Sequence, residues 1–249
     1  MRGRPTFALW PFTPAVKQIV IANGAIWLAS VLLVVWAEWP AAYEVLRLEP
    51  GRVVGDLEIW RLATWMWVHD PTGLYHVLLN LLFLWMFGGT LEIAWGTRGF
   101  WRYYLLCGLI SGVVVLLAGL LFDPETPVVG ASGAIYGVVV AWIFVNPERR
   151  IWLFGVFPMK GKHFALIPIG FAVAGFLLRD SGVSHSAHLG GMAAGALLVT
   201  GYWRPRKLAN RLRYFWIRRK LKIYQGGRDR RDRRDDDGRP PPPDGGYWQ

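Results

Sequence analysis

The 249-residue chain has the composition of a membrane protein, not that of a soluble domain. Hydrophobic residues make up 53% of it, tryptophan occurs 15 times and the mean hydropathy is +0.28. The formal net charge is +11, but 15 of the 28 Lys and Arg residues lie in residues 204–249, so the basicity belongs mostly to the tail. The single cysteine, Cys107, excludes an internal disulfide.

Six apolar stretches, each about the length or half the length of a bilayer span, follow one another along the chain. They are residues 18–36, 75–94, 101–122, 132–145, 164–178 and 185–203. The fourth and fifth are shorter than the roughly 20 residues that a lone span needs, so we expect them to extend into flanking residues or to lie inside the bundle. The sequence thus predicts an all-α membrane domain of six helices over residues 18–203.

The charges flanking these stretches predict an orientation. Lys and Arg in short segments near span ends are retained in the cytoplasm, and their distribution places both termini there. Residues 1–17 form a short cytoplasmic N-terminus without a cleavable signal peptide. Residues 37–74 form a long outer loop whose tryptophans suit the headgroup layer, so we expect it to be embedded in the membrane. We expect a multi-pass protein of the cytoplasmic membrane.

The tail divides into two parts. Residues 204–225 mix apolar and basic residues, which indicates an amphipathic helix on the anionic inner leaflet. Residues 226–249 are charged, low in complexity and almost free of aliphatic residues, which is typical of disorder. The arginine run is interpreted as a membrane anchor and not as a nucleic-acid site.

Polar residues within the apolar stretches are functional candidates, because such groups are costly in a bilayer. With the predicted topology, most of them lie near the outer ends of the second, fourth and sixth spans, so three helices bring them to one depth. The set comprises His76, Asn80, Glu92, Ser132, Tyr136, His185 and His188.

Small residues indicate which helices meet. His188 is followed by Gly191 and Gly195 at helical spacing, and Gly133 begins a matching stripe on the fourth span. Close contact of these two helices would bring Ser132 to His188. Glu92 lies near the inner end of its span, where a capping or helix-contact role is favoured.

A serine facing a histidine supports nucleophilic catalysis. His188 would take the proton of Ser132 as general base, and no carboxylate is placed to complete a triad. The Ser132 backbone N–H, Asn80 and His76 would stabilise the oxyanion, while Tyr136 would stack on His188. No metal or cofactor is expected, since a His-Glu-x-x-His motif is absent. His185 is interpreted as an interfacial histidine and His69 as a structural loop residue.

At these residues the sequence resembles the rhomboid family of intramembrane serine proteases, from about residue 58 to 195. Four motifs occur in the family's order: Trp60-Arg61 in the outer loop, His76 and Asn80 with Glu92 below them, Gly130-x-Ser132-Gly133, and Ala187-His188 with Gly191 and Gly195. The stretch from His69 to His76 is slightly longer than usual in the family.

The resemblance implies a six-helix core with Ser132 as nucleophile and His188 as base. His76 and Asn80 are implied as oxyanion partners, Tyr136 as support for the histidine, and Trp60 and Arg61 as residues that hold the outer loop together. It also implies an active site open to the outer side and single-pass transmembrane proteins as substrates. The alternative is a catalytically inactive relative that binds transmembrane helices without cutting them. The oligomeric state is left open.

Overall fold

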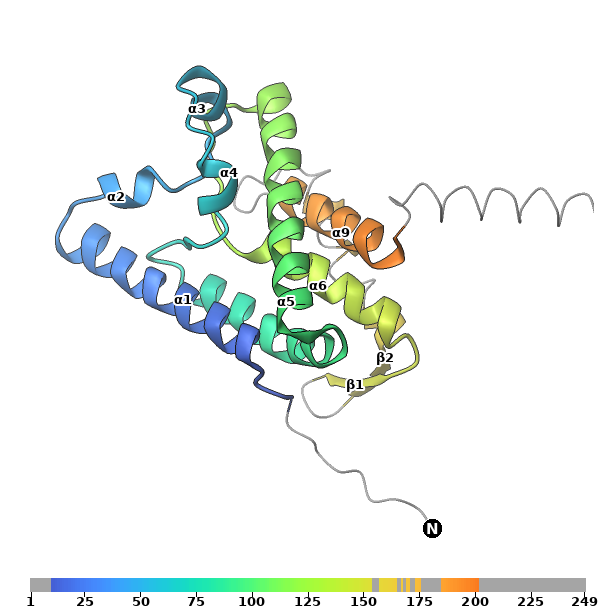
Figure 1. The fold of residues 1–249 in the computed structure, drawn as a ribbon. Helices are drawn as coiled ribbons and strands as arrows, with labels where there is room; N and C mark the ends of the chain where they lie inside the picture. Colours follow the sequence, from blue (N-terminus) through green and yellow to red (C-terminus); the bar gives the residue numbers. More distant parts are fainter. Residues whose placement is uncertain are drawn as a thin grey trace, which may run out of the picture. The chain divides into compact units, whose positions relative to one another are not determined.

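A computed structural model describes residues 10–153, 157–164, 167, 169–170, 173–175 and 185–201 (Figure 1). Most of the predicted fifth span and all of the tail (204–225 and 226–249) lie outside these residues. In chain order the elements are α1 (Pro14–Ser30), η1 (Val31–Trp36), α2 (Ala41–Glu44), α3 (Pro50–Gly55), α4 (Arg61–Thr64), α5 (Leu74–Phe122), α6 (Ser132–Val145), β1 (Arg150–Leu153), β2 (Phe157–Lys160), α7 (Gly161–Phe164) and α9 (His185–Thr200). The described part of the chain is mostly helical.

The helix α5 is two helices joined at a break. Its 49 residues would extend over about 73 Å at the 1.5 Å rise of an α-helix, more than twice a bilayer core. The break is at Gly96, whose φ of 74° and ψ of 159° are reached readily only by glycine. Figure 1 shows α5 changing direction sharply between its two halves. The two halves correspond to the predicted second and third spans, and α1 continued by the π-helix η1 corresponds to the first.

The N-terminus of α1 is capped by the carboxylate of Glu92 from α5. Glu92 is 3% exposed and accepts hydrogen bonds from the backbone N–H groups of Ala15, at 2.9 Å, and Val16, at 3.1 Å. It also accepts from the hydroxyls of Thr13 and Thr97. A negative charge among the free N–H groups of a helix start is favourable, and this one also holds the turn after Gly96. Glu92 therefore joins the start of α1 to the break inside α5.

The outer loop is held together by Arg61 and Trp60. The guanidinium of Arg61 is 1% exposed, pairs with Glu58 and donates at 2.6 Å to the backbone oxygens of Glu44 and Arg47. The indole N–H of Trp60 donates to the backbone oxygen of Val45 at 3.0 Å. These bonds satisfy carbonyls that lie between the short helices α2 and α3, where no ladder could pair them.

One element departs from the predicted all-α fold. The segment after α6 forms an antiparallel hairpin of β1 and β2, with Arg150 paired to Lys160 and Leu153 to Phe157. The sequences RIWL and FPMK contain aromatic and β-branched residues, which favour extended backbone. In the sequence this segment lies between the fourth and fifth predicted spans, 132–145 and 164–178, where no strand was predicted.

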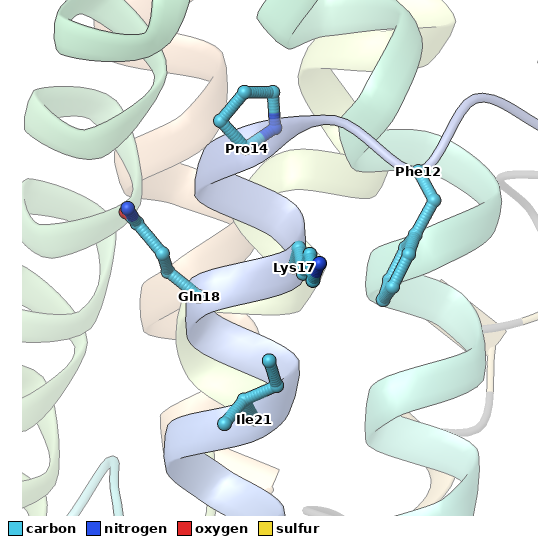
Figure 2. Close-up of a pocket in the computed structure, with 5 residues that line it drawn as sticks. All are labelled: Phe12, Pro14, Lys17, Gln18 and Ile21. Atoms are coloured by element: carbon cyan, nitrogen blue, oxygen red, sulfur yellow. The ribbon is translucent and has the colours of Figure 1, made fainter.

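A shallow pocket lies on the first turns of α1. It is lined by Phe12, Pro14, Lys17, Gln18 and Ile21, which Figure 2 shows along one side of the helix. Gln18 points toward the neighbouring helix, where its side-chain oxygen accepts from the indole N–H of Trp101 at 3.1 Å. None of the predicted site residues lines this pocket.

The helices α6 and α9 meet with their backbones in close contact. A Cβ placed on Gly191 would lie 1.9 Å from the backbone oxygen of Gly133, and one on Gly195 would lie 2.7 Å from the Cα of Gly137. Backbones meet here because neither helix carries a side chain at the contact. The second half of α5 supports both helices: the hydroxyl of Ser111 donates to the backbone oxygen of Ala187 at 2.6 Å.

We expect Gly191→Ala to destabilise the protein by about 1–3 kcal/mol, because its methyl group would push α9 off α6. Thermal unfolding in detergent measures the change. Gly24→Ala in α1 is the matched control, since no atom lies within 4 Å of its Cβ position and alanine favours a helix more than glycine does. Equal unfolding midpoints for the parent and Gly191→Ala would contradict the close contact.

Candidate active site

The structure brings Ser132 and His188 together. Ser132 is the first residue of α6 and His188 lies in the first turn of α9. Their side chains are 8% and 7% exposed, and the distance from Ser132 Oγ to His188 Nε2 is 2.9 Å. A hydroxyl and an imidazole nitrogen at this distance form a hydrogen bond through which a proton can be transferred.

The ring of His188 is fixed by an aromatic neighbour. Tyr136, one helical turn after Ser132, stacks on it with centroids 4.2 Å apart and an interplanar angle of 21°. For His188 to accept the hydroxyl proton at Nε2, a neutral ring must carry its own proton on Nδ1. Stacking restricts the ring to one plane, so the Nε2 lone pair stays directed at Ser132.

The turn before Ser132 needs a glycine. Gly130 has a φ of 117°, and a Cβ placed on it would lie 2.8 Å from Nε2 of His76. Its N–H donates to the backbone oxygen of Trp65 at 3.0 Å, which fastens the turn to the outer loop. The predicted Gly-x-Ser motif therefore serves both backbone conformation and space, and His76 lies beside the turn that carries the serine.

Asn80 differs from the expected arrangement. It is 7% exposed and lies one turn after His76, but its amide donates at 2.9 Å to the backbone oxygen of His76. The structure thus records this amide bonded to its own helix and not directed at an oxyanion. A change of side-chain rotamer would free the N–H groups.

His69 is a site residue that the sequence reading assigned only to loop structure. It is fully buried, and its Nε2 accepts the N–H of Ala131 at 3.3 Å. Its ring also lies edge-on to His76, with centroids 5.3 Å apart. Burial lowers the pKa of His69 to about 3, with the nearby His76 as a second cause. His69 therefore stays neutral and holds Ala131, the residue next to Ser132.

The two backbone N–H groups of the turn differ in their hydrogen bonding. The N–H of Ala131 donates to His69, whereas the N–H of Ser132, the first residue of α6, has no acceptor within the helix. That N–H is available to an oxyanion. Among the described residues, no group of three or more His, Cys, Asp and Glu side chains has the geometry of a metal site.

A buried serine hydrogen-bonded to a stacked histidine is the arrangement that serine hydrolases use, and here it lies among apolar helices. In comparison with known proteins, the rhomboid domain model matches residues 56–205, more than half of the chain. The chain belongs to the rhomboid family and is a membrane protein, as its two long apolar helices, Pro14–Trp36 and Leu74–Phe122, also indicate.

The sequence of the chain is about one third identical to those of several curated relatives. The chain is 30% identical over 154 residues to the rhomboid protease GluP of Bacillus subtilis, covering 62% of this chain and 28% of the relative. It is 33% identical over 129 residues to the mitochondrial rhomboid protein 1 of Saccharomyces cerevisiae, covering 49% and 36%. It is 34% identical over 191 residues to RHOMBOID-like protein 4 of Arabidopsis thaliana, covering 72% and 44%. The chain thus spans less than half the length of each.

We expect stability to depend on pH through His69. Because its pKa is lowered in the fold, its contribution is complete above about pH 6.5 and is lost as the pH falls toward 3. The unfolding temperature should fall from pH 7.5 to 5, and less steeply in His69→Gln, whose amide oxygen can accept from Ala131 but cannot be protonated. Exposed His163→Gln is the control and should keep the slope of the parent. An unchanged slope in His69→Gln would refute this account.

Proposed function

We propose that the protein is an intramembrane serine endopeptidase that hydrolyses peptide bonds in or near transmembrane helices of membrane protein substrates. The observation that carries the proposal is the 2.9 Å distance between Ser132 Oγ and His188 Nε2. Family membership and the protease among the relatives support the same reaction. The proposed catalytic unit is a Ser132–His188 dyad without a carboxylate.

In the acylation step, Ser132 Oγ attacks the substrate carbonyl carbon and its proton passes to Nε2 of His188. The protonated histidine then gives this proton to the leaving amine, and the acyl group remains on Ser132 as an ester. A water molecule, deprotonated by His188, attacks the ester and restores the serine. Tyr136 keeps the imidazole in plane throughout.

The negative oxygen of the tetrahedral intermediate needs donors. The backbone N–H of Ser132 at the start of α6 is one, with the helix dipole in its favour. The side chains of His76 and Asn80 are the proposed others, and Asn80 would exchange its bond to the His76 carbonyl for one to the oxyanion. In a site this buried, each such bond is stronger than in water.

The proposal includes a location for the reaction. A chain with six spans and both termini in the cytoplasm places the outer ends of α5, α6 and α9 toward the outer face, where water reaches the site. The substrates would be single-pass transmembrane proteins in the cell membrane. The basic tail, residues 204–225, would lie on the anionic inner leaflet.

Ser132→Ala and His188→Ala should each abolish cleavage of a model single-span substrate in liposomes, because nucleophile and base act as one unit. A fluorophosphonate should label the parent but not Ser132→Ala. Ser30→Ala, which removes a hydroxyl bonded only within α1, is the matched control and should cleave normally.

Cleavage by Ser132→Ala at the rate of the parent would refute the catalytic role. A parent that binds the substrate helix but neither cuts it nor reacts with the fluorophosphonate would identify the alternative, an inactive helix-binding relative. Both outcomes are read from the same reconstituted samples.

Asn80→Ala should lower kcat by about 10² to 10³, the usual effect of removing one oxyanion donor, with KM nearly unchanged. Asn23→Ala is a control, because that buried amide donates to Ile19 within α1, in another helix. An equal loss in both variants would assign Asn80 to folding and not to catalysis.

A further inference from the structure

A second histidine lies beside the base and is not used in the dyad. His185 is the first residue of α9, three positions before His188, so both side chains lie on neighbouring parts of one helix face. The two rings are edge to face, with centroids 6.0 Å apart and an interplanar angle of 84°. Among the described residues, Ser132, Tyr136 and His185 are the recorded hydrogen-bond and ring neighbours of His188.

The ring of His185 is enclosed although the residue lies at a helix end. Both of its nitrogens are buried, and neither has a hydrogen-bond partner among the described residues. The ring packs against Gly175: a Cβ placed there would lie 2.0 Å from Cε1 of His185. Among the described residues, the imidazole therefore has packing contacts but no hydrogen-bond partner.

Buried polar atoms are almost always hydrogen-bonded, and an imidazole has one donor and one acceptor to satisfy. Water is the partner that such groups take when protein offers none. No direct hydrogen bond is recorded between His185 and His188. A single water bridges two nitrogens that lie about 4.5–5.5 Å apart, a separation that rings with centroids 6.0 Å apart allow.

We propose that His185 is a positioning residue for the base: it holds one water against His188, and this water accepts the N–H of His188 Nδ1. The inference rests on the proposed function and deepens it. The bond keeps the His188 proton on Nδ1, which leaves Nε2 free for the serine. It also stabilises the imidazolium formed when His188 takes the proton, the task that a carboxylate performs in a triad.

The test compares His185→Leu and His185→Gln in proteoliposomes, with kcat and KM for a single-span substrate and the rate of fluorophosphonate reaction at Ser132. His185→Leu should lower kcat and the labelling rate about tenfold to hundredfold, the scale for removing the hydrogen-bond partner of a functional histidine. KM should stay within about twofold. His185→Gln, whose amide can still hold water, should retain most of the rate.

His163→Leu is the matched control, because this exposed histidine lies in α7 and belongs to no part of the site. Since leucine fits differently against Gly175, His185→Ala is measured as well, and imidazole added to that variant should restore labelling. A structural role predicts instead parallel losses in Leu, Gln and Ala variants without rescue by imidazole.

The inference is overturned if His185→Leu reacts as fast as the parent, or if Gln and imidazole restore nothing. Those results leave the Ser132–His188 reaction standing, because the parent still cleaves and is labelled at Ser132. Failure of the proposed function is distinct: the parent then neither cleaves nor reacts at Ser132, and the inference falls with it.

Discussion

The contact between the backbones of α6 and α9 determines the site. Gly191 meets the backbone oxygen of Gly133 so closely that no Cβ fits between them. Because Ser132 directly precedes one glycine and His188 is three residues before the other, this approach also brings the two side chains to 2.9 Å. A side chain at Gly191 would separate the helices and lengthen the same bond, whereas one at Gly133 would meet Ser111 of α5 and Trp65. The packing of α6 against α9 and the hydrogen bond between Ser132 and His188 thus both depend on the distance between these two helices.

The serine turn is supported from the outer loop as well as from the helices. Arg61 ties the loop's own carbonyls together, and from this braced loop His69 reaches the N–H of Ala131. A buried neutral imidazole suits this task, since it accepts a hydrogen bond without introducing charge. The loop therefore contributes to the position of the Ser132 turn, although none of its residues contacts Ser132 or His188 through a recorded hydrogen bond.

Sequence patterns predicted the helices well where hydropathy and spacing are local signals: the fourth stretch coincides with α6, and the Gly-x-Ser and Ala-His motifs identified the residues that meet. Long-range polar partners carry no such signal. A capping role for Glu92 was favoured from its place near a span end, but its partner, the start of α1, does not follow from spacing. The bond from Ala131 to His69 does not follow from spacing either, because both contacts join residues more than 60 positions apart. The bond of the Asn80 amide to its own helix was not predicted, because a hydropathy profile does not show which acceptor a side chain chooses. The hairpin after α6 was not predicted, because its two short extended segments give only a weak hydropathy signal.

The Glu92 cap has a consequence for biosynthesis. Thr13 and Glu92 are separated by 79 positions, so a chain made from its N-terminus completes α1 long before its cap exists. Until residue 92 has been synthesised, the N–H groups of Ala15 and Val16 have no bond to Glu92. The cap therefore cannot join α1 to α5 at the stage when α1 is made, and it forms only with the two-helix unit around Gly96.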